Sequence, residues 1–227
     1  MSTVLSTKKL KENQRSLLLN AGVSLVEYNA INIEFVPYEV PVNIENAIFT
    51  SQNGVNSFFE NVRSNKSTSI GGTPIEKCFC VGEKTKSLLE ENGQKVIKMT
   101  EYATELADYL VKNHKNDSFH FFCGNIRSDE IPSKLKENNI TFEEIEVYKT
   151  TLNLKKFERQ FYAVLFFSPS GVRSFFSENK LNAAKAICIG KTTASEAKKY
   201  TEYVVISNTT TVESVIAKAV NTLKNDD

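Results

Sequence analysis

An internal repeat constrains the fold of this chain more than any other feature. Residues 51–59 read S-Q-N-G-V-N-S-F-F, and residues 168–176, which lie 117 positions later, read S-P-S-G-V-R-S-F-F. A second pair follows at 81–85 (V-G-E-K-T) and 189–193 (I-G-K-T-T). A third, weaker pair relates residues 119–148 to the N-terminal segment. Repeats of this length indicate a duplicated half-protein rather than a solenoid. We therefore expect two similar lobes with a ligand-binding cleft between them.

Short apolar strands alternate with amphipathic helices along the chain, a pattern typical of α/β folds with parallel sheets. The short polar segment 114–118 joins the units on either side of it into one continuous lobe. The N-terminal unit must then complete the C-terminal half of the chain. Pro37 and Pro41 favour extended backbone at the first crossing between the lobes. A division after residue 118 stays open on the pattern alone. The predicted boundaries are a discontinuous lobe of 1–36 plus 152–227, a continuous lobe of 40–148, and hinge crossings near 36–41 and 148–153.

Composition excludes several classes of protein. The net charge of +1 and the absence of Lys/Arg runs longer than two argue against nucleic acid as a partner. No apolar stretch reaches the roughly 18 residues of a membrane span, and the N-terminus enters a strand pattern without a signal peptide, so a cytoplasmic location is expected. The four cysteines lie in apolar runs without zinc-ligand spacing, which predicts buried thiols and no metal site. They are Cys78, Cys80, Cys123 and Cys188.

Candidate ligand-binding residues lie in the turns that follow the strands. In a parallel sheet these turns meet at the carboxyl edge, where ligands bind, and helix N-termini there favour anions. Each turn alone also fits ordinary helix capping, but the set repeated in two lobes favours a shared anionic ligand. The candidates are Ser51, Asn53, Gly82, Thr85, Gly124, Asn125, Ser168, Ser170, Gly171, Gly190, Lys191, Thr192 and Thr193.

Several familiar catalytic motifs are absent. The G-K-T at 190–192 is not a phosphate-binding loop, because Lys185 stands where that motif requires glycine. No G-x-G-x-x-G or G-x-S-x-G occurs, and neither His114 nor His120 has a visible cluster of partners. The remaining candidate for a catalytic role is Tyr148, at the expected end of a strand. Its phenol can donate a proton in a cleft or pack at the hinge with its hydroxyl satisfied by backbone, and position alone leaves both open.

With these residues assembled, the chain resembles the uroporphyrinogen-III synthase family over nearly its whole length. The matching motifs, in the family's order, are F-T-S-Q-N-G-V (49–55), V-G-E-K-T (81–85), F-C-G-N-I-R followed by I-P and L (122–135), V-Y-K-T (147–150), F-F-S-P-S-G-V (166–172), I-G-K-T-T-A (189–194) and T-T-T-V-E-S-V-I-A-K-A (209–219).

The resemblance implies two flavodoxin-like α/β domains with doubly wound parallel sheets, joined by a two-stranded ladder. It also implies cyclisation of hydroxymethylbilane, a linear tetrapyrrole polycarboxylate, to uroporphyrinogen III. In that reaction loss of the terminal hydroxyl gives an azafulvene, a spiro-pyrrolenine forms, and ring D is inverted before the macrocycle closes. The family uses neither metal nor cofactor and acts as a monomer, and its catalytic tyrosine maps to Tyr148. Transient contact with hydroxymethylbilane synthase is expected.

Because the substrate also closes spontaneously to the uninverted isomer, orientation should dominate over strong acid–base groups. Few basic side chains are expected near the site, so carboxylate recognition would rest largely on backbone N–H groups; the candidates are Lys84, Arg127, Arg173 and Lys191. The polar segment 64–74 could cover the cleft. An alternative is a non-catalytic two-lobe protein that binds or senses small anions, and a third is a degenerate regulatory relative.

Overall fold

The computed structural model describes residues 2–64 and 75–224. The chain divides into two compact units, one formed by Met1–Asn32 and Thr151–Asp227 and the other by Ile33–Thr150. The predicted crossings, near 36–41 and 148–153, stand close to these boundaries. Apart from Ser64, the polar segment that could cover the cleft lies outside the described residues.

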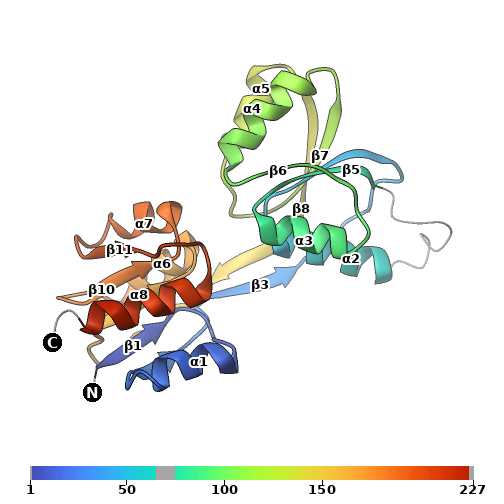
Figure 1. The fold of residues 1–227 in the computed structure, drawn as a ribbon. Coiled ribbons are helices and arrows are strands. Elements are labelled where there is room, and N and C mark those ends of the chain that lie inside the picture. The colour runs from blue at the N-terminus through green and yellow to red at the C-terminus, as the bar shows by residue number, and fades with distance from the viewer. Residues whose placement is uncertain (1, 65–74, 225–227) are drawn as a thin grey trace. The chain divides into compact units, whose positions relative to one another are not determined.

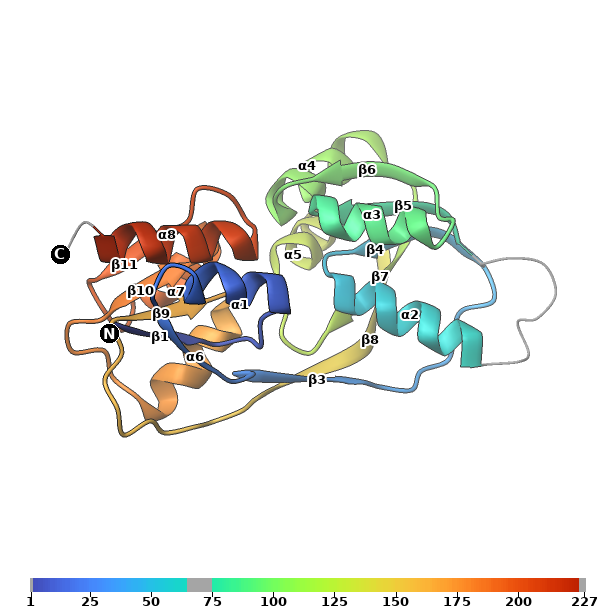
Figure 2. The ribbon, with the colours of Figure 1, turned by 60° about the horizontal axis from the view of Figure 1, so that its bottom comes forward.

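The first unit is a five-stranded sheet in the order β11-β10-β9-β1-β2, and all of its neighbouring strands are parallel. Numbered along the chain within the unit, this order is 5-4-3-1-2, which is the flavodoxin-like arrangement read from the far edge. Figures 1 and 2 show the sheet between its helices. The strands are β1 (Thr3–Ser6), β2 (Ser24–Glu27), β9 (Ala163–Phe166), β10 (Lys185–Cys188) and β11 (Val204–Ile206), and the helices are α1 (Glu12–Leu19), α6 (Pro169–Glu178), α7 (Lys191–Ala197) and α8 (Val212–Lys224).

Two apolar layers hold this sheet. One face packs against α1 and α8 through residues such as Leu18 and Ile216, and the other packs against α6 and α7 through Phe175 and Ala194. The helix that follows β1 therefore lies on the opposite face from the helix that follows β9. Between these neighbouring strands the chain direction around the sheet reverses, and such switch points are where α/β sheets bind ligands.

The second unit repeats this plan with a different chain order. Its sheet runs β3-β8-β7-β4-β5-β6, and β4 to β8 pair in parallel. Because the chain enters at β4, the order β8-β7-β4-β5-β6 is the flavodoxin-like order, circularly permuted. The strands are β3 (Ile31–Phe35), β4 (Ile44–Phe49), β5 (Ile75–Val81), β6 (Val96–Thr100), β7 (Ser118–Gly124) and β8 (Thr141–Leu152), and the helices are α2 (Gln52–Ser64), α3 (Glu83–Glu91), α4 (Ala103–Asn113) and α5 (Glu130–Glu137).

Aromatic packing fills the layer under α2 and α3, where Phe49 stacks on Phe122 with ring centroids 5.1 Å apart and Phe58 meets both rings edge-on. The opposite layer, under α4 and α5, combines leucine and isoleucine with Phe79, Phe119 and Phe121. The switch point of this unit lies between β7 and β4, because α5 and α2 cover opposite faces. The predicted parallel α/β fold is thus confirmed, with the repeated segments in equivalent places.

The prediction of buried thiols is confirmed, since all four cysteines are free and buried. Cys78 and Cys80 lie in the same apolar layer, as their alternate positions in β5 require. Burial raises the pKa of each of these two thiols to about 12, so both stay protonated near neutral pH. They act as small core residues.

One strand is longer than the sequence pattern indicated. The pattern ends the last strand of the continuous lobe at Tyr148, but β8 continues to Leu152. The extension is stabilised by the side chain of Asn125, whose Oδ1 accepts from Thr150 N–H at 2.8 Å and whose Nδ2 donates to Thr150 O at 3.3 Å. On its other side β8 neighbours β3. The Asn125 contact, past the end of β7, is one that apolar periodicity does not reveal.

Within the described parts of the chain, the helices are all too short or too polar to cross a lipid bilayer.

Candidate functional site

Tyr148 and Ser51 form the centre of the candidate site in the second unit. Ser51 directly precedes α2, after β4, and Tyr148 is the β8 residue that pairs with Gly124 at the end of β7. The two hydroxyl oxygens are 3.0 Å apart. The Ser51 oxygen also accepts a hydrogen bond from Gly54 N–H at 3.1 Å and so caps α2. One serine therefore links the helix N-terminus to the tyrosine, at the switch point of the sheet.

Gly124 sets the position of the Tyr148 ring. A Cβ placed on Gly124 would lie 2.5 Å from two ring carbons of Tyr148, a separation that no side chain tolerates. The tyrosine therefore packs flat on bare backbone. Its own carbonyl accepts from Asn125 N–H at 3.3 Å, and the preceding carbonyl of Val147 accepts from Ser57 Oγ at 2.5 Å. These bonds fix the backbone that carries the ring.

Tyr148 is 8% exposed, and burial raises the pKa of its phenol above the ordinary value. The hydrogen bond from Ser51 acts in the opposite direction and lowers this pKa, and the neighbouring Cys123 thiolate would raise it. The phenol is therefore protonated near neutral pH and can act as a proton donor.

Replacing Ser51 by alanine is expected to raise the pKa of Tyr148 further, because the hydrogen bond that favours the phenolate is lost. Ser168→Ala provides a matched control, since Ser168 Oγ caps α6 through Gly171 N–H at 3.0 Å just as Ser51 caps α2. Each variant should lose about 1 kcal/mol of stability, but only Ser51→Ala should shift Tyr148. NMR titration of ring-labelled tyrosine measures this shift; an unchanged Tyr148 pKa in Ser51→Ala would contradict the assigned contact.

The other predicted residues of the second unit lie at the same edge in differing roles. Gly82 is the N-cap of α3 with φ of 88°, a backbone conformation that favours glycine, and Thr85 is buried within the first turn of that helix. Asn53 is half-buried in the first turn of α2. Asn125 is committed to Thr150, as described above, so its amide supports β8. Of the predicted set in this unit, the structure brings Ser51, Gly124 and Asn125 directly to Tyr148.

In the first unit the predicted residues fall on two neighbouring turns. Ser168 and Gly171 lie beside Thr7, whose Oγ1 donates to Leu165 O at 2.7 Å. Ser170 is buried and accepts from Arg173 at 3.2 Å. On the next turn, Gly190 is the N-cap of α7. Beyond it Lys191 and Thr192 are exposed, while Thr193 is buried.

Two of the four predicted basic side chains are already neutralised. Arg127 contacts Asp129 and Glu144 on the wall of a pocket of about 400 Å³ beside Gly124 and Asn125. Arg173 lies 3.5 Å from Glu196, a carboxylate that also binds Lys199 at 2.8 Å. Lys84 and Lys191 have no such partner in the described chain.

A basic turn in the first unit was not among the predicted residues. Lys8, Lys9 and Lys11 follow β1, at the carboxyl edge and beside the Ser168 turn, and all three are exposed. The sequence signal is K-K-L-K, one residue after the T-V-L-S strand. Among the described residues, no group of three or more His, Cys, Asp or Glu side chains is placed to hold a metal ion.

Comparison with known proteins identifies related sequences. Residues 13–217 match the family model described as uroporphyrinogen-III synthase HemD. A curated porphyrin biosynthesis protein HemD from Ruminiclostridium josui is 28% identical over 239 aligned residues, which cover 94% of this chain and 46% of that protein. The chain thus spans about half the length of this curated relative.

Solved structures show the same fold at low sequence identity. Uroporphyrinogen-III synthetase from Helicobacter pylori superposes with a TM-score of 0.74 at 18% identity, covering 98% of this chain and 100% of that one. A mutant uroporphyrinogen III synthase from Thermus thermophilus superposes with a TM-score of 0.69 at 14% identity, covering 99% and 100%.

Proposed function

Since the chain belongs to the uroporphyrinogen-III synthase family, we propose that it cyclises hydroxymethylbilane to uroporphyrinogen III, with loss of water and inversion of ring D. The observation within the molecule that best supports this function is the Ser51–Tyr148 pair at the switch point of the second unit. A protonated, rigidly held phenol suits a reaction whose first step expels a hydroxyl group.

Tyr148 is the proposed general acid. Its Oη gives a proton to the terminal hydroxyl of the substrate, which leaves as water while the pyrrole nitrogen lone pair forms the protonated azafulvene, an azafulvenium cation. The resulting phenolate is restored by the proton that the ring D carbon loses when the macrocycle closes, so the enzyme returns to its starting state. Proton donation of this kind contributes on the order of 10²–10⁴ in rate.

Ser51 is the proposed positioning residue for this proton. Its oxygen already accepts from Gly54 N–H, so its own hydroxyl proton is available to point at Tyr148 Oη. With Ser51 as donor, the phenol proton of Tyr148 is left free for the substrate. The same hydrogen bond stabilises the phenolate after transfer, in agreement with its lowering effect on the Tyr148 pKa.

The turns at the carboxyl edges are the proposed binding sites for the acetate and propionate groups of the substrate. Exposed helix N-termini supply N–H donors at these turns, and carboxylates are favoured there by charge and geometry. The residues proposed for this role are Ser51, Asn53, Gly82, Thr85, Gly124, Ser168, Ser170, Gly171, Gly190, Lys191, Thr192 and Thr193; Asn125 is proposed to act by supporting β8.

The proposed enzyme is a cytoplasmic monomer that needs no cofactor. Its substrate is reactive enough to close without a catalyst, so a short path from the protein that makes it is an advantage. Transient contact with hydroxymethylbilane synthase fits this requirement.

A coupled assay tests the function. Hydroxymethylbilane is generated enzymatically in the presence of the purified chain, and the type-I and type-III isomers of the oxidised product are separated. We expect type III to dominate. A protein that only binds or senses the anion would leave type I as the product, as in buffer, and this result would refute the proposal.

A further inference from the structure

The turn between β1 and α1 has an unusual charge arrangement. We call residues 8–11, with the sequence K-K-L-K, the lysine loop. Leu10 is 4% exposed and anchors the loop in the core under α1, while Lys8, Lys9 and Lys11 are exposed. The loop lies at the carboxyl end of β1, at the switch point of the first unit.

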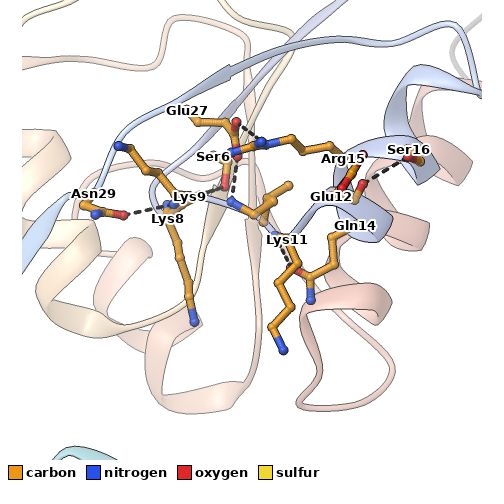
Figure 3. A network of polar contacts seen from close by, with 11 residues as sticks. Ser6, Lys8, Lys9, Lys11, Glu12, Gln14, Arg15, Ser16, Glu27 and Asn29 are labelled. Atoms are coloured by element: carbon orange, nitrogen blue, oxygen red, sulfur yellow. Dashed lines mark hydrogen bonds and ion pairs between the residues drawn. The ribbon is translucent and has the colours of Figure 1, made fainter.

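The backbone of the lysine loop is held by side chains. Lys9 N–H donates to Asn29 Oδ1 at 3.0 Å, Leu10 N–H to Glu27 Oε1 at 2.6 Å, and Lys11 N–H to Gln14 Oε1 at 3.0 Å. Figure 3 shows these contacts, with the three lysine side chains extending away from them. Because these three N–H groups already have acceptors, an anion bound at the loop would contact the lysine side chains rather than these N–H groups.

The three lysines are not neutralised by the surrounding protein. Within residues 2–64 and 75–224, no carboxylate lies within ion-pair distance of Lys8, Lys9 or Lys11. The nearby Glu27 instead bonds Arg15 at 2.8 Å. The positive end of the α1 dipole lies beside these cations, and Lys11 occupies the N-cap position that serine or aspartate normally takes. Glu12 in the first turn of α1 offsets part of this repulsion. The remaining repulsion among the positive charges disfavours the unliganded protein.

In the second unit, the basic side chain that follows β7 is neutralised by carboxylates. Glu144 lies in β8, the strand beside β7, as Glu27 lies in β2, the strand beside β1. There it contacts the side chain of Arg127, which also contacts Asp129. A glutamate of the neighbouring strand thus neutralises a cation in one unit, whereas in the other unit it holds the backbone of a loop whose cations stay exposed.

We propose that the lysine loop binds carboxylate groups of a polycarboxylate ligand through the ammonium groups of Lys8, Lys9 and Lys11. The proposal rests on the proposed function, in which that ligand is the linear tetrapyrrole. It assigns part of carboxylate recognition to side chains of the first unit, in place of recognition by backbone alone. Glu27 and Asn29 are positioning residues that fix the loop.

The test variant is Lys8→Gln/Lys9→Gln/Lys11→Gln. We expect its KM for hydroxymethylbilane to rise about tenfold, because each exposed ionic contact contributes a fraction of the binding free energy. The dependence of KM on ionic strength should also weaken, since fewer charges are screened.

The matched control is Lys112→Gln/Lys115→Gln/Lys198→Gln, which removes the same charge from exposed lysines at helix ends away from the carboxyl edges. Its KM should change less than twofold. Equal changes in both triple variants, or none in the lysine-loop variant, would overturn the proposal.

A second measurement is independent of turnover. Uroporphyrin I is an unreactive octacarboxylate whose binding can be followed by fluorescence, and the lysine-loop variant should bind it about tenfold more weakly than the wild type. Without ligand, the variant should melt at the same temperature as the wild type or higher, because repulsion at the α1 N-terminus is relieved. If the wild type forms no type-III isomer, the proposed function fails, yet this titration still decides the role of the loop. Equal affinity of wild type and variant would refute it.

Discussion

Replacing Tyr148 by phenylalanine is expected to slow formation of the type-III isomer by about 10²-fold or more, since the phenol is the proposed acid for loss of water. The fold should persist, because the ring still packs on Gly124. Only the 3.0 Å contact with Ser51 is lost, at a cost of about 1 kcal/mol. The rate is measured in the coupled assay at early times, with the isomers separated, and the stability by urea unfolding.

Tyr28→Phe is the matched control for this substitution. Tyr28 directly follows β2 in the first unit, is 5% exposed, and has its phenol pKa raised to about 12 by burial. Its ring packs edge-on against Phe157 in the core. Removing its hydroxyl should leave the type-III rate unchanged. If Tyr148→Phe also retained the full wild-type rate, Tyr148 would be a packing residue and the proposed acid would be wrong.

Replacing Gly124 by alanine should disrupt the site from beneath. The new methyl group would overlap two ring carbons of Tyr148 at 2.5 Å, and β7 is held in place by β4 and β8 on either side. The ring must therefore move. We expect a loss of about 2 kcal/mol in unfolding free energy, typical of overpacking. A displacement of about 1 Å in the phenol should lower activity by about 10²-fold. Urea unfolding and the coupled assay measure the two effects.

The double variant Gly124→Ala/Tyr148→Ala separates the steric clash from other effects of the alanine. With the ring removed, the methyl group has space, so adding Gly124→Ala to Tyr148→Ala should cost little stability. This non-additivity is the signature of direct contact. A penalty for Gly124→Ala that is the same with and without the tyrosine ring would show that the glycine matters for another reason.

The fold could be predicted from the sequence because the internal duplication gives two copies of each pattern. The match between residues 51–59 and 168–176 aligns the weaker pairs, and each half then shows the alternation of strand and helix that is typical of parallel sheets. The extended crossing after Tyr148 was predicted, but its place in β8, beside β3 and with the amide of Asn125 bonded to Thr150, was not. Such a contact between a side chain and a distant backbone leaves no periodic signal.

Only part of the candidate site could be predicted from the sequence. Turn residues such as Ser51 and Gly190 could be placed at the carboxyl edges by topology alone. The pairing of Ser51 with Tyr148 could not, because the two residues lie 97 positions apart and meet through strand register. The lysine loop was overlooked because its significance lies in what surrounds it. Only the contacts of Glu27 and Asn29 distinguish a fixed, unneutralised cluster from an ordinary solvated run.

The isomer distribution as a function of protein concentration tests the central claim most directly. With hydroxymethylbilane supplied at a constant rate, the type-III fraction should rise with the amount of chain added until it accounts for nearly all the product, because capture of the substrate then outpaces spontaneous closure. A type-III fraction that stays at the level found in buffer at every concentration, with folded protein present, would contradict the account.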